Sequence, residues 1–131
     1  EALLLDTNGY VAEASGENIF MVENGVIYTP NLGSAILGGI TRDTLITLAR
    51  ELNYEVVEAQ MTRDMLYLAD ELFMCGTAAE VTPVRELDQR MIGKGGAGEV
   101  TLALQKRYFD VVKGDDMTPP EWYTFYQVSN L

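Results

Sequence analysis

The dipeptide Asn24-Gly25 restricts the fold more than any other feature, because it stands between two short apolar segments. Asn18–Glu23 precedes it and Val26–Thr29 follows it, and both segments are rich in β-branched and aromatic residues. An Asn-Gly pair between such segments is the strongest short-range signal for a two-residue β-hairpin. The sequence therefore predicts an antiparallel pair of strands at this point, and a sheet to which other strands are added.

Further strands are predicted where apolar runs end in turn-forming residues. They are Ala2–Leu5, Tyr10–Glu13, Tyr54–Glu58, Glu71–Cys75 and Val81–Leu87. Pro83 lies inside the last of them, which favours an edge strand or a bulge because proline cannot donate to a ladder.

Three helices are expected between and after these strands. The first follows Gly38-Gly39-Ile40-Thr41, with Thr41 as N-cap and Asn53 near the end. Apolar residues at three- and four-residue steps predict its inner face, and charged residues its outer face. The inner set is Leu45, Leu48, Ala49 and Leu52, and the outer set is Arg42, Asp43, Arg50 and Glu51.

The second helix is expected over 62–69 and the third over Glu99–Lys113. The inner face of the third would hold Val100, Leu104, Tyr108, Val111 and Val112. Strands mixed with helices indicate one α/β domain over residues 1–131, with an aromatic tail at 121–126 docked on it.

Composition excludes several classes of function. The formal net charge of −11 disfavours nucleic acid and anionic membranes as partners. The absence of histidine removes Ser-His-Asp catalysis and most transition-metal sites, so no metal is expected. A single cysteine, Cys75, cannot form an internal disulfide and points weakly to the cytoplasm. The chain opens inside an apolar run without an initiator Met, which indicates a fragment.

Two glycine-containing segments are candidate phosphate cradles. Gly38–Thr41 precedes a helix, whose free N–H groups and dipole suit an anion. Gly76–Ala79 ends an apolar strand, and its small side chains would let backbone amides approach a ligand. Each segment also fits an ordinary tight turn. Glu13 is the candidate carboxylate, since a glutamate among small apolar neighbours needs a cationic or hydrogen-bonding partner unless it faces solvent.

Taken in order, three motifs resemble the fold-type IV pyridoxal-phosphate enzymes. They are Asn8–Phe20, Leu37–Asp43 and Gly76–Val84. Within that group, the Gly-Glu-Asn-Ile-Phe and Gly-Thr-Ala-Ala-Glu segments look like branched-chain amino acid aminotransferases. The resemblance implies the larger C-terminal α/β domain of such an enzyme, a mixed sheet or pseudo-barrel with flanking helices, with its first elements missing.

The resemblance also implies residue roles. Glu13 would bind the pyridine nitrogen of pyridoxal phosphate, and Leu37 would pack on its ring. The backbone amides of Ile40, Thr41 and Thr77 would bind its phosphate. Thr77 and Ala78 would help to hold the substrate carboxylate.

No catalytic residue is expected in this chain. The Schiff-base lysine of the family lies upstream of the opening strand, and Lys94, Lys106 and Lys113 occupy no matching motif. Glu99 stands where the family often has proline before the helix, and Gly38 likewise replaces a frequent proline. These two changes affect loop rigidity and leave the assignment intact.

The function implied is amino transfer between Leu, Ile or Val and 2-oxoglutarate, with the isolated chain inactive. The alternatives are a D-amino acid aminotransferase, an aminodeoxychorismate lyase-like enzyme, and a non-catalytic, self-associating module. Ala2–Leu5 and Asn18–Val22 are expected nearest an open sheet edge, which favours a homo-oligomer.

Overall fold

The Asn24-Gly25 hairpin forms as predicted and lies within the main sheet. Strands β3 (Asn18–Glu23) and β4 (Val26–Pro30) pair antiparallel, with Glu23 opposite Val26. Asn24 and Gly25 both have positive φ, at 51° and 78°. That geometry is required by the hairpin turn whose twist matches its strands.

The computed structural model describes residues 1–116 and 119–125, and its main sheet has five strands in the order β5-β4-β3-β6-β7. The remaining members are β5 (Val56–Ala59), β6 (Glu71–Gly76) and β7 (Glu80–Pro83). Only the β4–β5 pair is parallel, so the sheet is mixed. The expected α/β class and mixed sheet are confirmed.

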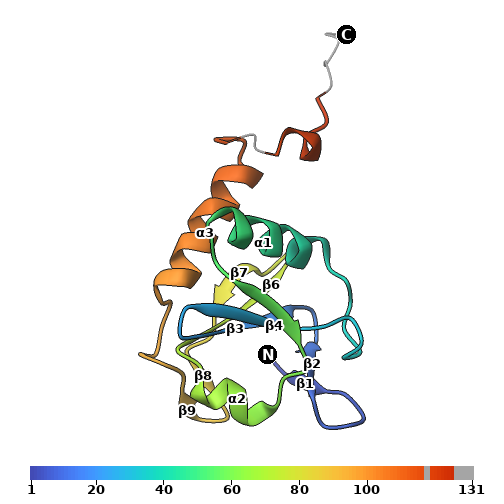
Figure 1. The fold of residues 1–131 in the computed structure, drawn as a ribbon, viewed down its shortest axis with the longest axis vertical. Coiled ribbons are helices and arrows are strands. Elements are labelled where there is room, and N and C mark those ends of the chain that lie inside the picture. The colour runs from blue at the N-terminus through green and yellow to red at the C-terminus, as the bar shows by residue number, and fades with distance from the viewer. Residues whose placement is uncertain (117–118, 126–131) are drawn as a thin grey trace.

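Two layers cover this sheet (Figure 1). Helices α1 (Ile40–Glu51) and α3 (Glu99–Val112) pack over one side. Helix α2 (Arg63–Leu68) lies on the other, with two small sheets made of β1 (Leu3–Leu5) with β2 (Val11–Ala14) and β8 (Glu86–Leu87) with β9 (Arg90–Met91).

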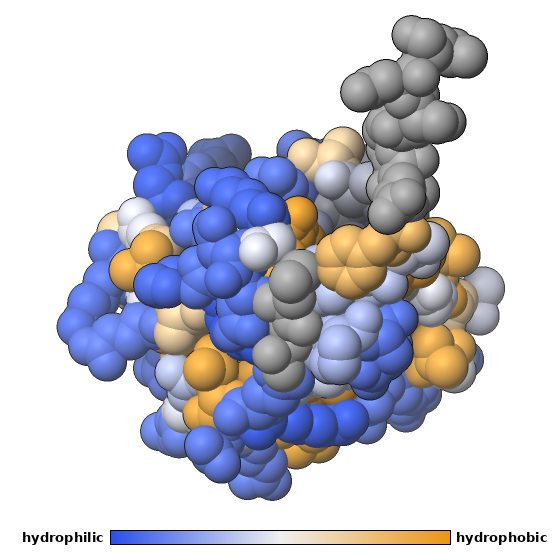
Figure 2. All heavy atoms as spheres, turned by 90° about the horizontal axis from the view of Figure 1, so that it is seen from above, coloured by the Kyte–Doolittle hydropathy of each residue, from blue (hydrophilic) through white to orange (hydrophobic). Residues whose placement is uncertain are grey.

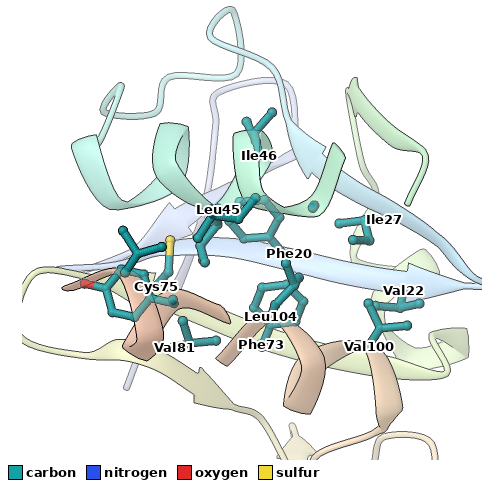
Figure 3. Close-up of a cluster of buried hydrophobic side chains, with 14 residues drawn as sticks. Phe20, Val22, Ile27, Leu45, Ile46, Phe73, Cys75, Val81, Val100 and Leu104 are labelled. Atoms are coloured by element: carbon teal, nitrogen blue, oxygen red, sulfur yellow. The ribbon is translucent and has the colours of Figure 1, made fainter. Parts of the chain in front are cut away.

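Each side of the sheet has its own apolar cluster. On the α1–α3 side, Phe20 of β3 and Phe73 of β6 stack with ring centroids 5.0 Å apart, and Leu45 and Leu104 from the two helices close over them (Figure 3). On the other side, Met61 and the α2 residue Leu66 pack with strand residues of β2, β3 and β6. The cleft described below therefore lies beside a sheet that is packed on both faces.

The first helix departs from prediction in three respects. It begins at Ile40 with Gly39 as N-cap, so Thr41 lies within its first turn and does not cap it. Arg42, expected on the outer face, is 5% exposed, and Leu52, expected inside, lies exposed at the C-cap. Leu45, Leu48 and Ala49 are buried as predicted.

The third helix buries four of its five predicted inner residues, and Val112 alone is exposed. Beyond it, Tyr123 packs against the α1–α3 cluster and its hydroxyl donates to the carbonyl of Val111 at 2.7 Å. Trp122 and Phe125 are exposed, so only part of the described tail is docked. Tyr126 lies outside the described residues.

The predicted strand Val81–Leu87 is wrong in its extent. It divides at Pro83 into β7, which forms an edge of the main sheet as the proline indicated, and β8. β8 and β9 are joined by Asp88 and Gln89, both at positive φ, a turn without the glycine that usually marks one.

The expectation of an open edge near Asn18–Val22 is also wrong, because β3 lies in the interior of the sheet and is buried there. β1 fits the expectation, since Leu4 and Leu5 are 47% and 45% exposed.

The face seen from above in Figure 2 is mostly hydrophilic, with hydrophobic residues in separate patches. In the part of the chain that the structure describes, no helix has the length and apolarity needed to cross a membrane.

Candidate functional site

A cleft of about 340 Å³ opens where β2, the start of α1 and the end of β6 meet. It is bordered by every residue for which a cofactor contact was expected: Glu13, Leu37, Ile40, Thr41 and Thr77. Ala78, the second residue expected at the substrate carboxylate, does not border it. Segments far apart in sequence thus meet at one cleft.

Glu13, on β2, is half-buried and held by one of its two oxygens. Its Oε2 atom accepts hydrogen bonds from the Asn18 side-chain amide at 3.0 Å and from the Leu37 backbone N–H at 2.9 Å. Within residues 1–116 and 119–125 no hydrogen bond to Oε1 is found. The carboxylate is therefore fixed through Oε2 alone.

The first turn of α1 forms a second part of the cleft. No side chain caps this helix at Gly39, so the N–H groups of Ile40 and Thr41 remain free hydrogen-bond donors at the helix start. The helix dipole adds partial positive charge there. Thr41 and Tyr108 of α3 both border a neighbouring cleft, and burial raises the pKa of the Tyr108 hydroxyl.

Close backbone contact is built into this start of α1. A Cβ atom on Gly39 would lie 2.5 Å from the side-chain oxygen of Asn18. No real Cβ sits that close, so a side chain at position 39 would displace either Asn18 or the helix start. The closeness of Asn18 is thus the geometric reason for a glycine at position 39.

The end of β6 forms the third part. Gly76 leads into the turn at Thr77, and a Cβ at position 76 would lie 3.1 Å from the carbonyl oxygen of Gly16. Cys75, just before it, is fully buried in the α1–α3 cluster, and burial raises the pKa of its thiol to about 12. The thiol therefore stays protonated at neutral pH and acts as a packing residue, as expected (Figure 3).

None of the three lysines borders the cleft. Lys94 borders a different cleft beside β6, Lys106 pairs with Asp110, and Lys113 lies over the ring of Phe109. No cluster of His, Cys, Asp or Glu that could hold a metal ion occurs among the described residues. The cleft is thus bordered by two carboxylates, those of Glu13 and Glu17, and by backbone donors, but by no lysine.

Two buried groups near the cleft were missed by the sequence interpretation. Asn18 is 7% exposed and contacts both Glu13 and the Leu37 carbonyl, at 2.9 Å. Arg42 donates to the carbonyl of Pro30 at 2.9 Å and to the carboxylate of Glu58 at 2.7 Å, which ties α1 to β4 and β5. The Asn18 signal was present in the Gly-Glu-Asn motif, whereas nothing local marks Arg42 as buried.

Comparison with known proteins agrees with this geometry. Residues 1–87 match the family model described as amino-transferase class IV. A branched-chain-amino-acid aminotransferase of Pseudomonas aeruginosa is 57% identical over 124 residues, which are 95% of this chain and 40% of that protein. One from Escherichia coli is 48% identical over 129 residues, 98% of this chain and 41% of that protein.

Solved structures give the same result. The branched-chain amino acid aminotransferase from Thermobaculum terrenum, in its PLP-form, superposes with a TM-score of 0.91 at 45% identity, covering 94% of this chain and 40% of that one. The chain spans about 40% of the length of the relatives it matches. On the family match and these identities, the chain belongs to the amino-transferase class IV family.

Proposed function

We propose that residues 1–131 are one partial domain, the cofactor-binding C-terminal part of a branched-chain-amino-acid aminotransferase that uses pyridoxal phosphate. The observation that carries this is the cleft itself. It brings the Glu13 carboxylate, with one free oxygen, and an uncapped helix start to the border of the same cavity of about 340 Å³. Ligand pockets for small molecules start at about 300 Å³, so a phosphorylated pyridine fits.

The residues suit the two ends of that cofactor. The free Oε1 of Glu13 would accept a hydrogen bond from the protonated ring nitrogen, and the exposed Leu37 would lie against the ring. The N–H groups of Ile40, Thr41 and Thr77 would hold the phosphate. Thr77 and Ala78 would hold the substrate carboxylate. The bound cofactor supplies an electron sink for chemistry at the substrate α-carbon.

The substrates proposed are a branched-chain amino acid and 2-oxoglutarate. Relatives at 57% and 48% identity are named branched-chain-amino-acid aminotransferases, which supports this choice over a D-amino acid aminotransferase or a lyase on the same fold. We place the protein in the cytoplasm on the basis of its single buried cysteine.

Backbone amide NMR tests the cofactor site. Inorganic phosphate and pyridoxine 5′-phosphate, which has no aldehyde to react with lysines, are titrated into the chain. The amides of Ile40, Thr41 and Thr77 should shift in saturable fashion with both ligands. The start of α3 is a matched control, because the carboxylate of Glu71 already occupies it and its amides should not respond.

The variant Glu13→Gln tests binding of the pyridine ring separately from binding of the phosphate. It removes the charge that would face the ring nitrogen, so affinity for pyridoxine 5′-phosphate should fall about tenfold, the value of one charge-assisted hydrogen bond. Affinity for inorganic phosphate should not change. Saturable shifts at the start of α3, with none at the start of α1, would refute the site.

We further propose that the chain forms a homo-oligomer through β1. Leu4 and Leu5 are exposed on a strand of the two-stranded β1–β2 sheet, and an apolar strand of this kind is a template for a second copy. Light scattering across a range of concentrations should show a dimer or larger species. The variant Leu5→Lys should shift the species toward monomer, whereas Leu102→Lys, at a similarly exposed leucine on α3, should not. A monomer at every concentration would contradict the proposal.

A further inference from the structure

We propose that Asn18 is a positioning residue that fixes the ring end and the phosphate end of the cleft relative to each other. The names of the two ends rest on the proposed function, whereas the link between them rests on geometry alone. Asn18 is the first residue of β3 and lies opposite Cys75 of β6, so its backbone belongs to the main sheet.

One amide group of Asn18 contacts both ends. Its Nδ2 atom donates one hydrogen to Glu13 Oε2 at 3.0 Å and the other to the Leu37 carbonyl at 2.9 Å. The N–H of Leu37 donates to the same Glu13 oxygen at 2.9 Å. The three residues thus form a closed hydrogen-bonded ring that is buried at Asn18.

The loop before α1 has few other anchors near its end. Its first part is held by Asn31, which accepts from Gly33 and Ser34. The side chains of Leu37 and Ile40 contribute little packing to the last part, because they are 72% and 86% exposed. Apart from a local bond, in which the Gly39 N–H donates to the Leu37 carbonyl at 2.9 Å, the backbone at Leu37 is held by its bonds to Asn18 and Glu13.

A second observation carries the link to the helix start. The loop passes so close to Asn18 that a Cβ on Gly39 would lie 2.5 Å from the Asn18 side-chain oxygen. Asn18 thus sets the position of Leu37 by hydrogen bonds and of Gly39 by contact. Since Gly39 is the N-cap of α1, the free amides of the helix start are placed by Asn18 as well. A site held ready in this way avoids ordering costs when its ligand binds.

The variants Asn18→Ala and Asn18→Asp test this in the 131-residue chain without ligand. The rate of hydrogen exchange at the Leu37 amide should rise about tenfold, which corresponds to the loss of one hydrogen bond. Core amides such as those of Phe20 and Phe73 should be unchanged, whereas a general loss of stability would accelerate them too. Asn8→Ala, in an exposed turn, should leave both sets unchanged. If Asn18→Ala does not fold, Asn18→Asp is used in its place, because it keeps the side-chain shape.

Ligand binding gives the second arm. With inorganic phosphate and unphosphorylated pyridoxine as separate probes, Asn18→Ala should weaken both by about tenfold. Glu13→Gln should weaken pyridoxine alone. Unchanged phosphate affinity, or unchanged exchange at Leu37, in Asn18→Ala would overturn the positioning role. If the unaltered chain binds phosphate but not pyridoxine, the proposed function fails while the phosphate and exchange results still decide the role of Asn18.

Discussion

The 131-residue chain, given pyridoxal phosphate, a branched-chain amino acid and 2-oxoglutarate, is expected to transfer no amino group at a measurable rate. The family's chemistry needs an amine held beside the cofactor, which acts as nucleophile and as general base. Lys94, Lys106 and Lys113 all lie away from the cleft. Removing a group with two such roles costs orders of magnitude in rate, roughly 10⁴-fold or more.

The assay follows 2-oxo acid formation over hours, with a full-length relative as positive control. Binding of pyridoxine 5′-phosphate, checked in parallel, shows that inactivity does not come from an unfolded chain. Cofactor-dependent turnover by the chain itself would contradict the expectation. Replacing the three lysines one at a time by arginine, which keeps the positive charge, would then identify the residue responsible.

The parts of the site that could be predicted are those whose signal lies in residues adjacent in the sequence. A glycine-containing turn before an apolar helical repeat indicates a helix start near Gly39, and Glu13 stands out as a carboxylate among small apolar neighbours. The structure brings both to one cleft. The prediction of Thr41 as N-cap failed because the helix begins one residue earlier, at Ile40, with Gly39 as the N-cap, so Thr41 lies inside the first turn.

Buried polar and charged groups were also missed because their partners lie on other elements. Arg42 falls at a polar position of the helical repeat, yet its guanidinium reaches Pro30 and Glu58, which lie on other elements. Periodicity reports the average polarity of a helix face and says nothing of partners across the fold. Asn18 was readable as part of a motif, but its double contact needs the loop at Leu37 to return to β3.

The same reasoning applies to Glu71, and it leads to the largest stability effect expected here. Glu71 begins β6 and is 9% exposed, and its carboxylate accepts hydrogen bonds from the start of α3. Oε1 accepts from the N–H of Val100 at 3.1 Å, and Oε2 accepts from the N–H and hydroxyl of Thr101 at 2.8 and 2.6 Å. Gly98, the N-cap, has no side chain to do this, and a Cβ there would lie 2.1 Å from the Glu71 carboxyl carbon.

The variant Glu71→Ala should therefore lower the free energy of unfolding by about 2–4 kcal/mol, because it removes charge-assisted bonds and leaves buried helix donors unpaired. Urea unfolding measures this as a lower midpoint at unchanged slope. Glu99→Ala is the matched control, since Glu99 is an exposed glutamate in the first turn of α3 and its loss should change stability by less than about 0.5 kcal/mol.

Gly98→Ala should destabilise as Glu71→Ala does, by displacing the carboxylate. Combined with Glu71→Ala it should add little, because the clash that it creates is with the side chain already removed. Full additivity of the two changes would mean that the carboxylate does not cap the helix.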